Sequence, residues 1–191
     1  MRHILLCAAA LGCATAIALV ALARPAEAPA GKRQIAINAR QTAQTIRLID
    51  RYRKETWRWQ KLMRRTRTPS NSAGQSPAPA YRAWLLRLWK QRAARARREA
   101  HDPPRRTAWL CIYRHERHPR MGWRTRTGNG LFGGLQMDLS FQRTYGADLL
   151  RFKGTAERWT AIEQIWVAER AYRSGRGFYP WPNTARSCGL I

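Results

Sequence analysis

The chain has 191 residues and a formal net charge of +25, so its length allows one domain of ordinary size plus appendages. The charge is uneven, because residues 29–106 carry a net +17 and residues 107–191 a net +7. A basic field attracts any polyanion, whether nucleic acid, anionic lipid headgroups or acidic wall polymers, so charge alone names no partner. A solvated basic surface with no dedicated ligand is the simpler alternative.

Residues 1–28 are typical of an export signal. Arg2 and His3 precede an apolar run over residues 4–22, and small residues follow up to Ala28, where cleavage is expected. The run is almost long enough to span a bilayer, so an uncleaved N-terminal membrane anchor is the alternative. Both alternatives predict that the remaining chain lies outside the cytoplasm, either secreted into the cell wall or held by an N-terminal membrane anchor.

Export affects the interpretation of the four cysteines. Cys7 and Cys13 fall inside the signal, which leaves Cys111 and Cys188 in the mature chain. Two cysteines in an oxidising compartment allow one pairing, so we expect a disulfide between them. These cysteines and the scattered histidines have no recognisable zinc-site spacing, and neither a metal nor a cofactor is expected.

Two basic helices are predicted ahead of the C-terminal domain. Residues 29–65 lack Pro and Gly from Gln34 onward and show apolar residues at near-helical spacing, which predicts an amphipathic helix. Residues 66–80, rich in Pro and Ser, predict a disordered linker. Residues 81–104 predict a second helix, whose apolar side packs on the first helix or the C-terminal domain, or lies on an anionic membrane or wall surface. That side comprises Trp84, Leu85, Leu88 and Trp89.

Residues 105–191 have the composition of one compact domain. Helices are predicted over residues 107–117, 139–145 and 159–174, with a Gly-rich stretch at 127–136 between the first two. Several helices around a short irregular or β-like turn indicate a mainly α or α+β fold.

The first of these helices places a carboxyl group on an apolar stripe. An aromatic residue stands at position i of this stripe, an isoleucine at i+3 and a second aromatic residue at i+4, and Glu116 follows at i+7. A poorly solvated carboxyl favours the protonated form that a general acid needs. The alternative is a glutamate that faces solvent or pairs with Arg114 or Arg117. The apolar members are Trp109, Ile112 and Tyr113.

The Gly-rich stretch suits a polysaccharide site. Its glycines would let the backbone approach a sugar closely, and they frame two neutral amides, Asn129 and Gln136, which can hydrogen-bond sugar hydroxyl and acetamido groups. Each amide is as well suited to holding the loop together. A phosphate-binding loop is disfavoured, since no Gly-Lys-Ser/Thr follows.

Three sequence motifs of this domain occur in a fixed order: TGNGLFGGLQMD at 127–138, EQIWVAER at 163–170, and GFYPWP at 177–182 followed by Cys188. In that order they resemble the T-G-N-G-aromatic-aromatic-G-G-[LV]-Q-F motif, the E-Q-I-x-V-A-E helix and the G-x-x-x-W-P…C ending of one family. This is the resuscitation-promoting-factor and actinobacterial transglycosylase-like family, within the lysozyme-like superfamily. The resemblance covers about residues 105–191.

The resemblance implies a lysozyme-like fold and a catalytic glutamate. The family's W-x-x-x-x-x-C-E-[SA]-G-G-N-W motif, aligned on Trp109, puts that glutamate on Glu116 without a gap. Two departures are visible: the cysteine has moved one helical turn earlier to Cys111, and the loop from Arg117 to Trp123 is two residues longer. We expect that loop to border the site and to affect substrate fit.

The implied activity is cleavage of the β-1,4 bond between N-acetylmuramic acid and N-acetylglucosamine in peptidoglycan glycan strands. Glycosidases generally use two carboxylates, yet here Asp138, Asp148 and Glu157 are weak second candidates, and Glu163 and Glu169 are expected to face solvent. We therefore expect Glu116 to act alone as acid and then base, giving either a 1,6-anhydro product or hydrolysis. Substrate contacts are expected from Asn129, Gly134, Gln136, Trp123, Phe132 and Trp181.

Two other functions fit parts of the sequence. A non-catalytic wall-binding module would use the basic helices for affinity and an inactive domain for recognition. A nucleic-acid binder would explain the charge, but the export signal argues against it. We expect a monomer whose basic helices contact anionic wall polymers or a membrane surface.

Overall fold

A computed structural model describes residues 30–70 and 78–191. The predicted export signal, with its two cysteines, lies outside these ranges, and so does the central part of the predicted linker. The chain forms two units, residues 1–38 and 39–191. The described part of the first unit is exposed helix, and the contacts discussed below all lie within the second unit.

Helices dominate the described residues, with one small sheet and several single turns. The mainly α fold expected from the sequence is thereby confirmed. In chain order the elements are α1 (Ala30–Leu62), α2 (Pro79–His101), α3 (Arg106–Glu116), η2 (Gly122–Arg124), β1 (Leu131–Phe132), β2 (Met137–Asp138), α4 (Leu139–Lys153), η3 (Ala156–Arg158), α5 (Ala161–Ala171), the π-helical turn η4 (Tyr172–Arg176) and α6 (Pro182–Ser187).

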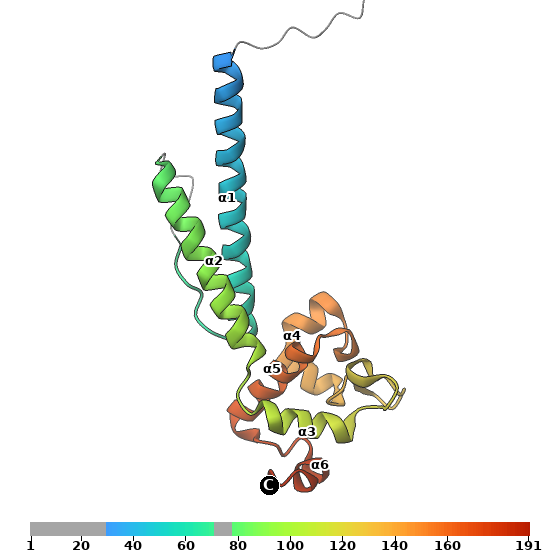
Figure 1. The fold of residues 1–191 in the computed structure, drawn as a ribbon. Helices are drawn as coiled ribbons and strands as arrows, with labels where there is room; N and C mark the ends of the chain where they lie inside the picture. The colour runs from blue at the N-terminus through green and yellow to red at the C-terminus, as the bar shows by residue number, and fades with distance from the viewer. Residues whose placement is uncertain (1–29, 71–77) are drawn as a thin grey trace, which may run out of the picture. The chain divides into compact units, whose positions relative to one another are not determined.

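The two basic helices are present. From Ala39 onward α1 lies alongside α2, and the two helices run in the same direction (Figure 1). Ile49 of α1 is buried against Leu85 and Trp89 of α2, which accounts for part of the apolar side predicted on the second helix. Trp84 is instead 48% exposed. No helix within the described ranges is both long and apolar enough to cross a bilayer.

The parallel arrangement requires the chain after α1 to turn back along it. The indole Nε1 of Trp57 donates to the carbonyl of Thr68 at 2.9 Å, and the amide of Gln60 exchanges two hydrogen bonds with the same threonine. The first part of the predicted linker, up to Thr68, is therefore held by side chains of α1.

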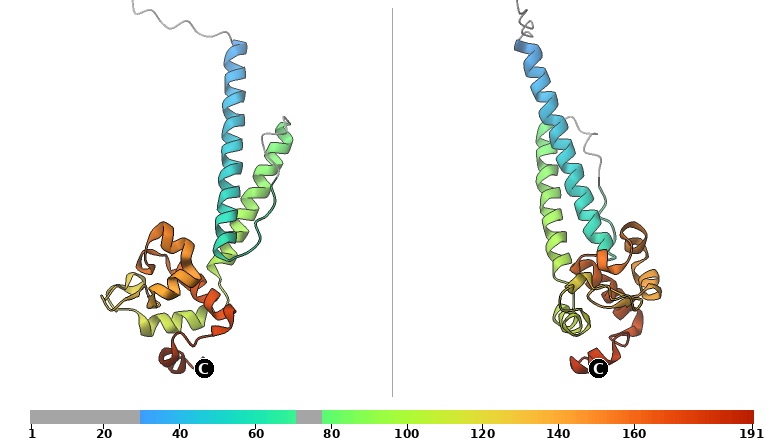
Figure 2. Two further views of the ribbon diagram at one scale, coloured as in Figure 1. Left: turned by 180° about the vertical axis from the view of Figure 1, so that it is seen from behind. Right: turned by 90° about the vertical axis from the view of Figure 1, so that its right-hand side faces the viewer.

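Helix α5 is the central element of the C-terminal domain (Figure 2). Nearly all of its residues from Glu163 to Ala171 are buried, so it is surrounded by other elements rather than lying on them. Trp109 of α3 and Trp181 are buried in the same core, with ring centroids 5.4 Å apart. Burying each such aromatic side chain contributes on the order of 2–3 kcal/mol.

Two helices differ in length from those predicted. The helix expected to end at Tyr145 is kinked directly after that residue, because Gly146 has a non-helical φ of −126° and ψ of 21°, and α4 then continues to Lys153. A Cβ on Gly146 would lie 2.6 Å from the ring of Trp159, so the glycine also permits close packing at the kink. Helix α5 begins later than predicted because Thr160 caps it, in a capping box with Glu163.

Candidate active site

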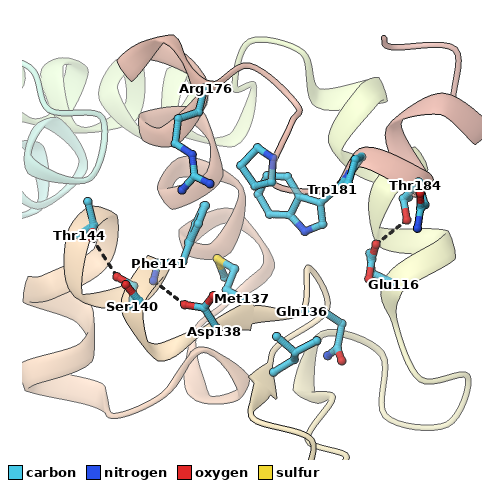
Figure 3. Close-up of a pocket in the computed structure, with 14 residues that line it drawn as sticks. Glu116, Gln136, Met137, Asp138, Ser140, Phe141, Thr144, Arg176, Trp181 and Thr184 are labelled. Atoms are coloured by element: carbon cyan, nitrogen blue, oxygen red, sulfur yellow. Dashed lines mark hydrogen bonds between the residues drawn. The ribbon is translucent and has the colours of Figure 1, made fainter.

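A cavity of about 420 Å³ opens beside the C-terminal end of α3 (Figure 3). Its wall is built from the end of α3, the β1–β2 hairpin, the first turns of α4 and the segment from Arg176 to Thr184. In Figure 3, Glu116 and Thr184 lie at one end, and Ser140 and Thr144 lie at the other. The lining residues are Glu116, Leu131, Gln136, Met137, Asp138, Ser140, Phe141, Thr144, Arg176, Pro180, Trp181, Pro182, Asn183 and Thr184.

Glu116 is the last residue of α3 and faces this cavity. Its side chain is half-buried, and its Oε1 accepts a hydrogen bond from the hydroxyl of Thr184. The neighbouring Arg117 donates elsewhere, to the carbonyl of Pro119 at 3.1 Å. The carboxyl group is therefore held by a neutral donor and keeps one side open to a ligand.

Two contacts join α6 to α3, a disulfide and the hydrogen bond between Thr184 and Glu116. The predicted disulfide between Cys111 and Cys188 is present and joins residues 77 apart in sequence. Thr184 lies one helical turn before Cys188, and Glu116 lies just over one turn after Cys111. The disulfide thus supports the placement of Thr184 beside the carboxyl. Sequence reasoning missed Thr184, although its spacing from Cys188 could have indicated it.

Asp138 is the second carboxylate in the cavity wall. It is the N-cap of α4, exposed to solvent, and its Oδ1 accepts from the backbone N–H of Phe141 at 2.7 Å. A capping carboxylate is committed to the orphan amides of its own helix. Arg176, also in the wall, adds a positive charge to this end of the cavity.

Gln136 lines the cavity with a backbone conformation that glutamine seldom adopts. Its φ is +49°, in the left-handed region, and such conformations concentrate at functional sites. Its Nε2 donates to the carbonyl of Gly133 at 2.8 Å, which closes the turn of the hairpin. The residue therefore holds the loop and also contributes to the cavity wall.

Four of the predicted substrate residues lie outside the cavity wall. Asn129 is exposed, and its Oδ1 accepts from the N–H of Leu131 at 3.1 Å within the loop. Phe132 packs against the domain core. Gly134 is buried and donates its N–H to Gln164 Oε1 at 2.8 Å. The fourth residue is Trp123.

Trp123 stacks on Tyr113, with ring centroids 4.0 Å apart and an angle of 7° between the planes. A Cβ on Gly134 would lie 2.7 Å from Tyr113 and 2.8 Å from Trp123, so the glycine gives this stacked pair its room. None of residues 117–123 lines the cavity. The expectation that this loop borders the site is therefore not met by the wall of this cavity.

Of the predicted aromatic contacts, Trp181 reaches the cavity. It is only 5% exposed, and its Nε1 donates to the carbonyl of Leu135 at 2.6 Å. This hydrogen bond joins two parts of the cavity wall, the segment from Arg176 to Thr184 and the β1–β2 hairpin. The side chain offers the cavity a small fixed apolar surface.

The expectation that Glu163 and Glu169 face solvent was wrong. Glu163 is 5% exposed and Glu169 is fully buried. Lys153 donates to both oxygens of Glu163, at 2.6 and 2.7 Å. Arg105 binds both oxygens of Glu169, at 3.1 and 2.6 Å, and the indole of Trp109 donates at 2.6 Å. Both acids are structural, since cationic partners compensate their charge.

Beside the site, the side chains of Cys111, His115 and Cys188 have ligand-type atoms within 4.8 Å of one another. In the oxidised protein the two sulfurs are bonded to each other. The cluster then offers one free imidazole, which is too few ligands for a zinc site.

The chain is similar to known proteins over part of its length. Residues 107–184 match the family model described as transglycosylase-like domain. The chain is 41% identical over 68 residues to resuscitation-promoting factor Rpf1 of Corynebacterium glutamicum, an alignment that covers 36% of this chain and 34% of the relative. The chain thus spans about a third of that relative's length. No solved structure matches.

Proposed function

Because residues 107–184 match the family model described as transglycosylase-like domain, we propose that this chain cleaves the glycan strands of peptidoglycan with Glu116 as its catalytic acid. The bond cut is the β-1,4 linkage between N-acetylmuramic acid and N-acetylglucosamine. The proposed division assigns residues 105–191 to catalysis, the basic residues 29–104 to attachment and residues 1–28 to export.

One observation carries the proposal. Glu116 faces a cavity of about 420 Å³ with a neutral hydroxyl as its partner, whereas Asp138, the other carboxylate in the wall, caps a helix. A general acid must give up and regain a proton beside the substrate, and a carboxyl without a cationic partner can do so. This arrangement favours one working carboxyl group.

The proposed reaction begins with proton transfer from Glu116 to the glycosidic oxygen as the bond from that oxygen to the anomeric carbon breaks. The resulting carboxylate then removes a proton from the attacking hydroxyl group. If this group is the C6 hydroxyl of the same sugar, a 1,6-anhydro ring forms; if it is water, the product has a reducing end. Both routes return the proton to Glu116 and balance without a cofactor.

The anhydro route is favoured because a retaining or inverting hydrolase generally places a second carboxylate to act as nucleophile or to activate water. Asp138 accepts the N–H of Phe141 in the described structure. Thr184 would act as a positioning residue that fixes the carboxyl rotamer, and Gln136 and Trp181 would form the wall against which a sugar lies.

The test is digestion of purified peptidoglycan by the wild type and by Glu116→Gln, with soluble muropeptides analysed by mass. We expect 1,6-anhydro muropeptides from the wild type and none from the variant. A matched control is Glu55→Gln on α1, which makes the same chemical change outside the domain and should leave release unchanged. Release by Glu116→Gln at the wild-type rate would remove Glu116 from the mechanism.

The same digest decides between the two chemistries and the binding alternative. Reducing ends in place of anhydro ends would replace transglycosylation by hydrolysis. If the wild type releases nothing but still sediments with peptidoglycan, the chain is a non-catalytic wall-binding module. We propose that the basic helices assist attachment to anionic polymers outside the cytoplasm, which predicts that sedimentation weakens as salt is raised.

A further inference from the structure

A second cavity, of about 610 Å³, lies where the end of α1 and the segment after it meet α4 and α5. Figure 2 shows the end of α1 close to this part of the domain in both views. Among its lining residues are five cationic side chains and one carboxylate: Lys61, Arg64, Arg65, Arg67, Arg170 and Asp148. The cavity is separate from the one that Glu116 faces and shares no lining residue with it.

The positive charge of this cavity is only partly compensated. Lys61 pairs with Asp148 at 3.1 Å, and Arg65 pairs with Glu99. Arg67 lies over the ring of Trp57, with its guanidinium carbon 4.3 Å from the centroid. Within residues 30–70 and 78–191, neither Arg67 nor its neighbours Arg64 and Arg170 have a carboxylate at ion-pair distance.

Arg170 is the most buried of these cations. It donates to the carbonyls of Tyr145 and Leu62 at 2.7 and 2.8 Å, while its Nε is buried and has no hydrogen-bond partner in the described structure. Burial, together with repulsion from Arg64, lowers the pKa of Arg170 to about 10. The guanidinium remains charged at neutral pH, and the attraction of Asp148, which also pairs with Lys61, offsets these two effects only in part.

Arg64 occupies a position that favours glycine. It follows α1 with a φ of +52°, and Arg65 N–H closes the helix end by donating to the carbonyl of Gln60 at 2.8 Å. Glycine is the usual residue at such a helix end because it adopts positive φ without strain. The sequence here places a cation there instead, at the wall of an already positive cavity.

We propose that this cavity binds a phosphate group. Guanidinium groups bind tetrahedral oxyanions through paired N–H donors, and a phosphate monoester brings up to two negative charges and three acceptor oxygens. Arg64, Arg67 and Arg170 supply the cations that lack carboxylate partners. A bound phosphate would offset the repulsion between Arg64 and Arg170 and so stabilise the junction between α1 and the domain.

The proposal is tested by titrating the full chain with inorganic phosphate at constant ionic strength, with chloride as the reference anion, and following thermal unfolding and heat of binding. A ligand that binds only the folded state raises the melting temperature, and the rise grows with the logarithm of its concentration relative to its dissociation constant. Arg64→Gly removes one cation and also relieves the positive φ, so the variant should fold at least as well as the wild type. We expect its phosphate affinity to fall about tenfold.

Arg67→Gln should weaken phosphate binding in the same way. Arg87 is an exposed residue of α2 outside the cavity, so Arg87→Gln removes one charge and should leave the affinity unchanged.

Glycerol phosphate and vesicles containing phosphatidylglycerol identify the source of the phosphate group. A response to free phosphates assigns a soluble or polymer-borne group, and a response to vesicles alone assigns a lipid headgroup. Equal binding by wild type and Arg64→Gly, or no response to any of the three probes, would overturn the proposal. Muropeptide release should be unchanged in Arg64→Gly, which keeps this test independent of the proposed activity.

Discussion

The end of α3 and the interior of α5 hold glutamates in opposite environments. Glu116 is half-buried at the cavity, with the hydroxyl of Thr184 as its partner. Glu169 of α5 is fully buried and accepts two hydrogen bonds from Arg105 and one from Trp109. Residue type is the same in both regions, and the partner decides what the carboxyl group can do.

A glutamate whose two oxygens both accept hydrogen bonds from a cation has no oxygen left for a substrate, as at Glu169. A glutamate that accepts from one hydroxyl can exchange its proton with a substrate oxygen. Helix α5 therefore carries structural acids, and α3 carries the acid proposed to be catalytic. Substitutions that remove only the carboxylate charge separate these two roles.

The largest expected effect is the loss of activity in Glu116→Gln. Removing a general acid lowers the rate by about 100- to 10,000-fold, while the free energy of unfolding should change by less than about 0.5 kcal/mol, as for other surface changes. Muropeptide release and urea unfolding measure the two quantities on one sample. A variant that is both inactive and strongly destabilised would assign Glu116 a structural role and erase the contrast with Glu169.

Removing the disulfide tests whether α3 and α6 need covalent support. In the double variant Cys111→Ser and Cys188→Ser, the closed loop between residues 77 apart is lost, and the chain-entropy model predicts a loss of about 4 kcal/mol. Activity should fall as well, because α6 carries Thr184. Unfolding of the wild type with and without reductant provides the independent comparison. An unchanged midpoint under reducing conditions would contradict this prediction.

Glu169→Gln should destabilise the domain by about 3 kcal/mol, because Arg105 would keep its charge beside a buried neutral amide. The indole of Trp109 can still donate to the amide oxygen, so the loss comes from the ion pair. Denaturant unfolding measures the change, and Arg105→Gln in the same background should restore part of it. Equal unfolding free energies for wild type and Glu169→Gln would show that the buried pair contributes no net stability.

The sequence was sufficient for the elements that local patterns specify. Helical periodicity predicted α1, α2 and α3, and the two remaining cysteines specified the disulfide. The motif around residues 127–138 indicated a candidate site, and the wall of the cavity described here includes Gln136 from that motif. The helices and the motif depend on residues that are close in sequence. The disulfide could be predicted because two cysteines allow only one pairing.

Other features depend on residues that meet only in the folded chain. Glu163 and Glu169 were predicted to face solvent because acidic residues on an amphipathic helix generally do, but Lys153 and Arg105 approach from other elements. Periodicity cannot reveal a helix that is covered on all sides. Likewise, the motif could not distinguish Gln136, which lines the cavity, from Asn129, which binds only its own loop in the described structure.

A smaller effect is expected from Thr184→Val, which keeps the shape of the side chain and removes its hydroxyl. Loss of one hydrogen bond costs about 1 kcal/mol, or roughly fivefold in rate if the bond positions the Glu116 carboxyl. The turnover number should fall while the Michaelis constant for soluble glycan fragments changes little, and Thr184→Ser should restore activity. If Thr184→Ser is as impaired as Thr184→Val, the methyl group matters and not the hydroxyl.

The smallest effect is a pH dependence of stability from Glu163. Burial alone would raise the pKa of this carboxyl, but hydrogen bonds from Lys153 and from the Thr160 backbone outweigh burial and hold its pKa below the usual range. The stabilisation is therefore present above the unfolded-state pKa of about 4.3 and is lost as pH falls through the lower folded-state pKa. Unfolding free energies at pH 7 and pH 3 should differ more in the wild type than in Glu163→Gln, by about 1 kcal/mol.

Glutamine can still complete the capping box with Thr160, so Glu163→Gln removes the charge and leaves the helix start intact. Glu99 offers the matched comparison, because its hydrogen bond with Arg95 also lowers its pKa but the pair lies on the exposed side of α2. The contribution of Glu99 to the pH dependence of the unfolding free energy should vanish in 0.5 M salt. The contribution of the buried Glu163 should persist, since salt screens exposed ion pairs more strongly. If both contributions vanish together, Lys153 and Glu163 behave as a surface pair, and burial on α5 does not protect them.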